Sequence, residues 1–286
     1  MKASGPGAFG KAMAQHFPFG LITLALALAV TIDPCLAASS VTADHVTLSI
    51  SLESATAPRK TVWAAITQTI APGWHTYWRN PGDSGLPTTV SWKLPSGVIA
   101  GEPLWPVPEQ FVTDAIVNFG YRDRAILIVP LTMTRTTSVH GTTAQATLSL
   151  LECEHICIPE TVSLDLDLNR HSGSPAIFAK ARAALPRTFN GSVSATSTKN
   201  ILTITMNSNE FRDVDASTLR FYPATPSVIN YGVASQIDAV GTTIRWHAVL
   251  SRSAKRFNRF EGVLSGPRIG SLTVSAVLES APASER

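Results

Sequence analysis

Two cysteines, Cys153 and Cys157, provide the clearest chemistry in the sequence, because they stand close together in the segment Leu150–Glu160 (LLECEHICIPE). Four extended residues span roughly 13 Å, whereas a disulfide requires Cα atoms within about 7 Å. If the two cysteines bond, the chain must therefore turn between them. The loop that such a bond closes is short, so its entropic contribution to stability is small. Small disulfides tend to be the labile ones, which suits them to thiol–disulfide exchange.

Other interpretations of the same segment stay open. The bond could simply hold the end of a strand in place. Cys153, His155 and Cys157 could instead offer two thiolates and an imidazole to copper(I) or zinc, with a fourth ligand such as His75 supplied from elsewhere. The chain could also be a non-catalytic β-sandwich that only binds or scaffolds envelope partners. We favour the exchange-active pair and predict no bound metal and no cofactor.

Two further segments could surround the cysteines. Residues 73–87 (GWHTYWRNPGDSGLP) combine three aromatic residues with Gly and Pro turn residues, which predicts a loop rather than a regular strand. In this loop we expect Trp74 in the core, whereas Tyr77 or Trp78 could fill the core or wall a binding cleft. The segment Phe111–Tyr121 (FVTDAIVNFGY) is apolar without clean alternation, so it predicts either a strand pair or a loop lying over the cysteines.

The segments that position these residues have the pattern of β-strands. In Val46–Leu52 apolar residues alternate with polar ones, the period of a strand with one buried face. Turn residues separate several such runs, without long helical periods between them, which predicts antiparallel β-sandwiches. The other expected strands are Lys60–Ile66, Thr89–Lys93, Ala125–Met133, Ala144–Leu151, Thr161–Leu168, Ser192–Ser197, Ile201–Met206, Thr218–Tyr222, Gln236–Asp238, Thr242–Leu250 and Ser271–Leu278.

One stretch interrupts the strands and divides the chain. Ser174 and Pro175 have the pattern of an N-cap and a first helical position, and the stretch Ala176–Leu185, closed by Pro186, is predicted to hold a short helix. We therefore predict a fold of two immunoglobulin-like antiparallel β-sandwich domains. Their predicted bounds are 38–171 for the first domain, 172–189 for the linker with its helix, and 190–286 for the second domain.

The first residues predict export. Lys2 and Lys11 precede the apolar run Phe17–Val30, which small residues follow, as in a secretory signal peptide cleaved after Ala37 or Ala38. An uncleaved membrane anchor is the alternative, and both place the rest of the chain outside the cytoplasm. We therefore assign residues 1–37 to a signal peptide and the protein to the periplasm.

The number of cysteines and the net charge argue against two other classes of protein. Cys35 would be removed with the signal peptide, which leaves only Cys153 and Cys157 in an oxidising compartment. A disulfide framework built for stability would use more bridges over longer loops. The formal net charge is +3 without a basic block, so nothing indicates a nucleic-acid partner.

The motifs together resemble the N-terminal periplasmic domain of the DsbD family of thiol–disulfide interchange proteins, and more closely its ScsB-like branch. The matching segments, in family order within residues 45–170, are Gly73–Trp78, Asn80–Gly85, Tyr121–Asp123 and Cys153–Glu160. Residues 190–280 resemble the second β domain of the ScsB-like branch. The cysteine spacing is tighter than in the best-known DsbD proteins.

The resemblance implies a function. A cysteine pair of this family accepts electrons from a membrane-embedded thiol carrier and reduces periplasmic thioredoxin-fold proteins, in disulfide reduction, cytochrome c maturation or copper-stress tolerance. It implies that Cys157 forms the mixed disulfide with partners and that a cap loop near Thr113–Phe119 shields the pair. Because the sequence ends at Arg286 without a membrane electron-carrying segment, we expect the donor to be another chain.

The predicted site therefore has two groups of residues. Cys153 and Cys157 are the expected redox-active, catalytic residues of a protein-disulfide reductase relay. The residues expected to bind partners or shield the pair are Tyr77, Trp78, Phe119, Tyr121, His155 and Pro159.

Overall fold

A computed structural model describes residues 39–53, 60–133 and 143–278. The predicted signal peptide, with Cys35, lies outside these described residues. The described residues belong to one compact unit. In the described ranges, no helix has the length and apolar character needed to cross a membrane.

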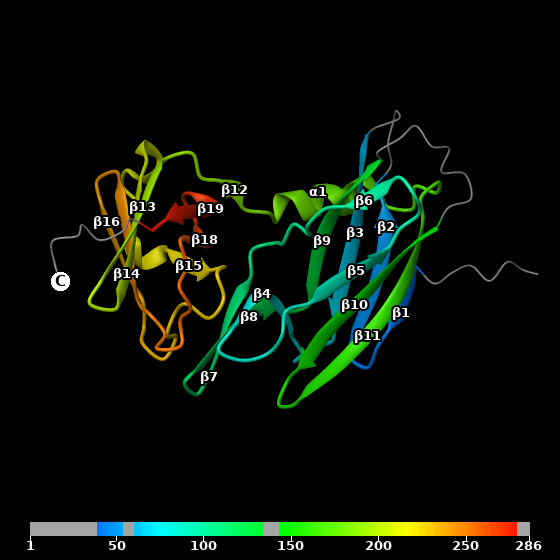
Figure 1. The fold of residues 1–286 in the computed structure, drawn as a ribbon, viewed down its shortest axis with the longest axis horizontal. Helices are drawn as coiled ribbons and strands as arrows, with labels where there is room; N and C mark the ends of the chain where they lie inside the picture. Colours follow the sequence, from blue (N-terminus) through cyan, green and yellow to red (C-terminus); the bar gives the residue numbers. More distant parts are fainter. Residues whose placement is uncertain (1–38, 54–59, 134–142, 279–286) are drawn as a thin grey trace, which may run out of the picture. The chain divides into compact units, whose positions relative to one another are not determined.

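The first eleven strands of the described chain form three antiparallel sheets (Figure 1). Their hydrogen-bonded orders are β1-β2-β3-β9-β6, β11-β10-β5 and β4-β8-β7. The strands are β1 (Ser40–Thr42), β2 (Val46–Leu52), β3 (Thr61–Ile70), β4 (Thr76–Gly82), β5 (Thr89–Lys93), β6 (Val98–Ala100), β7 (Glu109–Thr113), β8 (Ile116–Tyr121), β9 (Arg124–Met133), β10 (Thr143–Cys153) and β11 (Cys157–Asp167).

Alternation of apolar residues places the first core between two of these sheets. In β2, Val46 and Leu48 are buried while the residues between them are half-buried, as the sequence predicts. In β10, Ala146 and Leu148 are buried in the same manner. Residues of both sheets belong to one hydrophobic cluster, so the five-stranded sheet and the β5–β10–β11 sheet face each other as the layers of a sandwich.

A short helix, α1 (Pro175–Ala183), covers the other side of the five-stranded sheet. Its N-cap is Ser174, whose hydroxyl accepts a hydrogen bond from the Ile177 amide, and Pro175 begins the helix, which confirms the predicted start. Phe178 is buried and packs with Ile128 of β9.

The second group of strands forms two four-stranded sheets, β12-β19-β18-β15 and β13-β14-β17-β16. Stacked aromatic rings fill the core between them, with Phe221 and Trp246 centroids 4.4 Å apart. The elements are β12 (Arg187–Thr188), β13 (Ser192–Thr198), β14 (Ile201–Asn207), η1 (Asn209–Phe211), η2 (Ala216–Thr218), β15 (Arg220–Pro223), β16 (Gln236–Val240), β17 (Thr243–Val249), β18 (Arg259–Gly266) and β19 (Gly270–Val277). The predicted β-sandwich fold is therefore confirmed.

For two segments near the cysteines, the structure corrects one prediction and decides between the alternatives of the other. The prediction of a loop across residues 73–87 is wrong in its middle, because Thr76–Gly82 forms β4. The pairing of β4 with β8 changes register between Tyr77 and Gly82, so the strand tolerates Pro81 at an irregularity. The segment Phe111–Tyr121 is a strand pair, β7 and β8, which was one of the two predicted alternatives.

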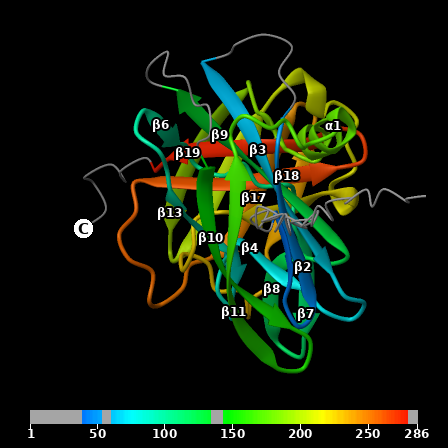
Figure 2. The same cartoon turned by 90° about the vertical axis from the view of Figure 1, so that its right-hand side faces the viewer.

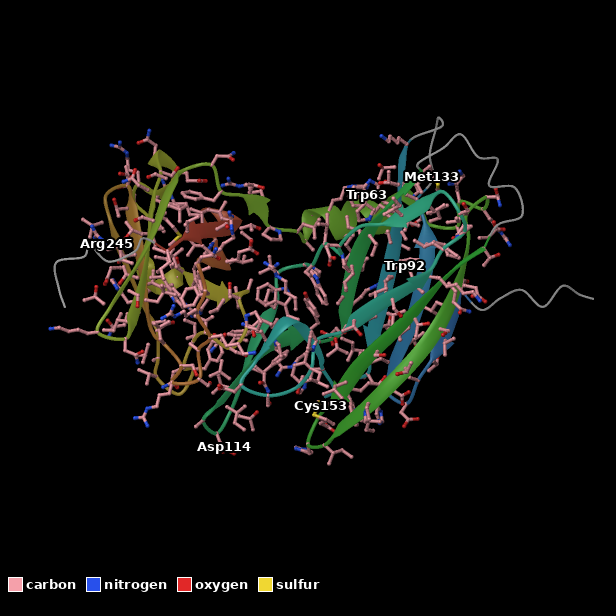
Figure 3. All side chains as sticks on the ribbon, viewed as in Figure 1. Trp63, Trp92, Asp114, Met133, Cys153 and Arg245 are labelled. Atoms are coloured by element: carbon pink, nitrogen blue, oxygen red, sulfur yellow. A yellow bond between two sulfur atoms is a disulfide. The ribbon has the colours of Figure 1, made fainter. Side chains whose placement is uncertain are left out.

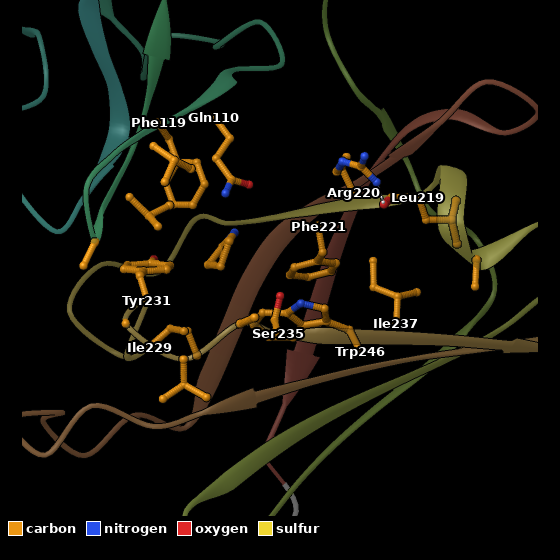
Figure 4. A pocket seen from close by; sticks show the side chains of 18 of the residues that line it. Gln110, Phe119, Leu219, Arg220, Phe221, Ile229, Tyr231, Ser235, Ile237 and Trp246 are labelled. Carbon is orange, nitrogen blue, oxygen red and sulfur yellow. Dashed lines mark hydrogen bonds between the residues drawn. The ribbon is translucent and has the colours of Figure 1, made fainter.

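The hairpin of β7 and β8 contacts the second group of strands. The Phe119 ring packs in T-shaped geometry on the Tyr222 and Tyr231 rings, at centroid distances of 6.0 and 5.3 Å. Beside these rings lies a cavity of about 780 Å³ (Figure 4). Its walls include Phe119 and Tyr231 together with Phe221 and Trp246 of the second core.

Candidate redox site

The two cysteines close the tip of a long β-hairpin. Strands β10 and β11 pair in unbroken register from Thr143 opposite Asp167 to Cys153 opposite Cys157, and two perpendicular views show the hairpin (Figure 1, Figure 2). A disulfide joins Cys153 and Cys157, whose Cα atoms are 4.2 Å apart. The chain therefore turns between the cysteines, as predicted for a bonded pair, and Figure 3 marks Cys153 at this end of the hairpin.

The two halves of the disulfide have different surroundings. Cys153 is only 2% exposed, whereas Cys157 belongs to the exposed residues of the hairpin tip. The neighbouring Ile156 is 67% exposed. An incoming sulfur atom therefore has access to the side of Cys157, and Cys153 can react only with a group already held inside the site.

Tyr77 approaches the disulfide from β4. Its hydroxyl donates a hydrogen bond to Cys153 Sγ at 3.2 Å and lies 3.7 Å from Cys157 Sγ. The side chain is buried, and this burial raises the pKa of Tyr77, so the hydroxyl remains a protonated donor at neutral pH. The structure thus brings Tyr77 into contact with both predicted catalytic residues.

His75 lies directly opposite Cys153 in the backbone. The His75 amide donates to the Cys153 carbonyl at 2.8 Å, and the Cys153 amide donates to the His75 carbonyl at 3.0 Å. The imidazole packs on the rings of Tyr77 and Phe111 at centroid distances of 5.2 and 4.9 Å. Burial, and secondly the Arg122 guanidinium, lower the pKa of His75 below its ordinary value.

A buried carboxyl group precedes the pair. Glu152 is fully buried, and its Oε2 accepts a hydrogen bond from the His45 amide at 2.8 Å. Its Oε1 has no hydrogen-bond partner among the described residues. Burial is the main cause that raises the pKa of Glu152. The His45 ring stacks on Trp74 at 3.5 Å, so this cluster fastens the start of β2 to the loop before His75.

Two further predicted site residues, Trp78 and Tyr121, lie on β4 and β8. Trp78 is buried under the Arg79 guanidinium, which stands 5.5 Å from its ring. The buried Tyr121 hydroxyl donates to the Pro106 carbonyl at 2.9 Å. Both side chains therefore support the strands that carry the site.

Among the described residues, the side-chain hydrogen bonds to the two sulfur atoms come from Tyr77, and not from Phe119, His155 or Pro159. The ring contacts of Phe119 are with Trp78, Tyr222 and Tyr231, on the side of the second sandwich. His155 is exposed in the hairpin turn, and Pro159 is exposed on β11. Within the described ranges, no group of three or more His, Cys, Asp or Glu side chains is arranged to hold a metal ion.

The comparisons with known proteins agree with this site. Residues 48–169 match the family model for the N-terminal region of the thiol:disulfide interchange protein DsbD. This segment contains β2 to β11 and the cysteine pair. The fold and the site define a thiol–disulfide interchange domain. Residues 48–169 of this chain form a DsbD N-terminal-like domain.

Solved structures extend the fold comparison to the second sandwich. The N-terminal periplasmic domain of ScsB from Proteus mirabilis is 24% identical, with a TM-score of 0.66, and the match covers 85% of this chain and 98% of that one. At this identity the match shows the fold. The match to the collagen-binding subdomain of the Enterococcus faecalis surface protein ACE is 8% identical, covers 42% of this chain and 95% of that one, and has a TM-score of only 0.25. No curated protein sequence matches the chain.

Proposed function

We propose that this protein relays electrons by thiol–disulfide exchange in the periplasm, between a membrane-embedded thiol carrier on another chain and thioredoxin-fold envelope proteins. The observation that carries the proposal is the asymmetric disulfide at the hairpin tip, with Cys153 buried and Cys157 exposed. A two-step exchange needs one sulfur that partners can reach and one that resolves the complex from inside.

The proposed exchange has two steps, attack by Cys157 and closure by Cys153. In the reduced protein the Cys157 thiolate attacks a sulfur of the partner's disulfide, and one partner sulfur leaves as a thiolate. Cys153, as a thiolate, then attacks Cys157 Sγ and releases the second partner sulfur. Two electrons pass to the partner, and the Cys153–Cys157 bond of the structure is restored. The donor's dithiol reduces this bond by the same steps in reverse.

Tyr77 has a supporting role in this proposal. A hydrogen bond from its hydroxyl to Cys153 Sγ favours the charged thiolate over the neutral thiol. Trp78 and Tyr121 hold β4 and β8 in place through buried contacts. His155 and Pro159, both exposed beside Cys157, are proposed to touch the partner rather than the sulfur atoms.

Trapping of mixed disulfides tests the assignment of the two cysteines. Cys153→Ser removes the resolving sulfur, so the complex between Cys157 and a partner should accumulate. Cys157→Ser leaves only the buried sulfur and should accumulate few complexes. Non-reducing gels of periplasmic extracts, with mass spectrometry of the trapped proteins, measure both.

Each result of this experiment has a defined meaning. Thioredoxin-fold proteins trapped by Cys153→Ser support the proposal. The reverse pattern would overturn the roles of the two cysteines but keep the exchange reaction. An absence of complexes from both variants would contradict the relay itself.

A further inference from the structure

The closing step of the proposed exchange presents a chemical difficulty at Cys153. That step needs a thiolate, because the thiol is a poor nucleophile. Burial disfavours a charged sulfur, and an ordinary thiol, with a pKa of about 8.5, is already mostly protonated at neutral pH. Cys153 is 2% exposed, so bulk water has little access to its proton. A proton acceptor within the site would remove this obstacle.

His75 is a titratable residue directly opposite Cys153 in the backbone pairing. Residues directly opposite in an antiparallel pair have side chains on the same face, with Cβ atoms about 5 Å apart. His75 and Cys153 are such a pair, joined by both backbone hydrogen bonds. Tyr77, two residues further along β4, reaches Cys153 Sγ on the same face. The imidazole therefore lies on the same face of the sheet as the Cys153 side chain.

We propose that His75 accepts the thiol proton of Cys153 while Cys153 attacks the mixed disulfide at Cys157. The Cys153 S–H bond breaks, and its proton moves to an imidazole nitrogen. The sulfur forms a bond to Cys157 Sγ, and the bond between Cys157 and the partner breaks. Its electron pair leaves on the partner sulfur, and His75 later returns its proton to that thiolate or to water. This inference rests on the proposed exchange function.

The charged and titratable groups around His75 suit this role. Arg122 stands 4.3 Å from the Phe111 ring that packs on the imidazole, and its charge disfavours protonated histidine. Glu109 of β7 pairs with Arg122 at 3.6 Å, and the Tyr77 ring packs on the imidazole from β4. On the hairpin side, the Glu154 carboxylate lies beside Gly73.

The sign of the pH dependence follows from these surroundings. Because burial and Arg122 lower the pKa of His75, the imidazole is neutral at pH 7 and able to accept a proton. The closing step should therefore slow as the pH falls through that lowered pKa. It should be independent of pH above it.

The reaction of the reduced protein with the chromogenic disulfide DTNB separates the two steps. Attack by Cys157 releases a first coloured thiolate at a rate proportional to the DTNB concentration. Closure by Cys153 releases a second one at a rate independent of that concentration. Stopped-flow absorbance at several pH values measures both phases in the wild-type protein, in His75→Gln and in the control His171→Gln. His171 is exposed, and its ring contacts the Glu53 carbonyl, away from the cysteines.

We expect His75→Gln to slow the second phase roughly 100-fold at pH 7 and to leave the first phase unchanged. Its second phase should then rise about tenfold per pH unit, following the Cys153 thiolate. His171→Gln should behave as the wild type. Equal second phases in wild type and His75→Gln at every pH would overturn the inference.

Two further outcomes also have a defined consequence. If His75→Gln fails to fold, the wild-type pH profile decides, because a second phase that rises without a plateau up to the thiol pKa would contradict a histidine acceptor. If the wild type shows no second phase at any pH, the exchange function itself is wrong. If the second phase is present and has the same rate in wild type and His75→Gln, only this inference is rejected.

Discussion

The same chemical group stands in two different environments at Cys153 and Cys157. Cys153 is enclosed by Tyr77 of β4 and by the backbone of His75 just before that strand, whereas Cys157 lies at the exposed tip. The sequence predicts the pair and, through the family resemblance, the role of Cys157. It suggests His75 only as a possible fourth metal ligand and contains no local signal for its pairing with Cys153, because the backbone bridge joins residues 75 and 153 across a long stretch of chain.

Removal of the Tyr77 hydroxyl should change the redox equilibrium. A donor stabilises a thiolate more than it stabilises a disulfide sulfur, which is a weak acceptor, so the hydroxyl favours the reduced pair. Tyr77→Phe should therefore lower the reduction potential by about 20 mV, or roughly 1 kcal/mol. Equilibration with glutathione buffers measures the change. Tyr222→Phe, which removes a hydroxyl from the second sandwich, is the control, and an unchanged potential in Tyr77→Phe would contradict the contact.

The sequence predicts a strand accurately where buried and more exposed residues alternate regularly along it. Strand β5 has its predicted bounds, and β2 does as well, because one face of each is consistently more buried than the other. Strand β18 (Arg259–Gly266) was not predicted. Its buried residues include the consecutive Gly262, Val263 and Leu264, so simple alternation is lost. For β4 the sequence predicts a loop, because Pro81 and the Gly residues around it are usual turn signals.

The position of Tyr77 depends on a glycine in the loop after β4. A Cβ atom added to Gly85 would lie 2.3 Å from the Tyr77 ring. Gly85 has φ +85°, and Gly241 has φ +61° with open space around it, so both alanine variants bear the cost of the left-handed backbone. Only Gly85→Ala should also displace Tyr77.

This pair of variants gives a matched test of the element that carries Tyr77. We expect Gly241→Ala to lose about 1 kcal/mol of unfolding free energy and to keep its reduction potential. Gly85→Ala should lose at least about 1 kcal/mol more and shift the potential in the direction of Tyr77→Phe. Urea unfolding and redox titration measure the two effects, and identical behaviour of both variants would contradict the packing.

The hairpin should not depend on its disulfide. Strands β10 and β11 pair over eleven residues each, and the bond closes only the turn at the tip. Replacement of both Cys153 and Cys157 by Ser should therefore preserve the fold and cost at most about 2–3 kcal/mol. Circular dichroism and urea unfolding check this. A double variant that fails to fold would show that the bond is a structural staple.

At the scale of the whole molecule, β4 connects the redox site to the second group of sheets. Tyr77 contacts the disulfide, and the fully buried Asn80 donates hydrogen bonds to the Pro223 carbonyl at 2.7 Å and the Tyr231 hydroxyl at 2.8 Å. Arg79 also pairs with Glu261 at 3.5 Å, but both side chains are about a third exposed, so this pair contributes little.

Asn80 should therefore contribute more to stability than an exposed asparagine. Asn80→Ala leaves the Pro223 carbonyl and the Tyr231 hydroxyl without their donor, which should cost about 1–3 kcal/mol. Asn169→Ala, at an exposed turn, should cost less than about 0.5 kcal/mol. Urea unfolding compares them. Equal losses would show that the Asn80 contacts do not stabilise the folded chain.

The reduction potential of the Cys153–Cys157 bond tests the central claim most directly. Structural disulfides have potentials below about −300 mV, whereas exposed, exchange-active ones lie higher. Since Cys157 is exposed and the bond closes a short turn, the purified protein should contain one intramolecular disulfide with a potential well above about −300 mV. Equilibration against glutathione and dithiothreitol buffers gives the value. A potential at or below about −300 mV would contradict the relay and assign the bond a structural role.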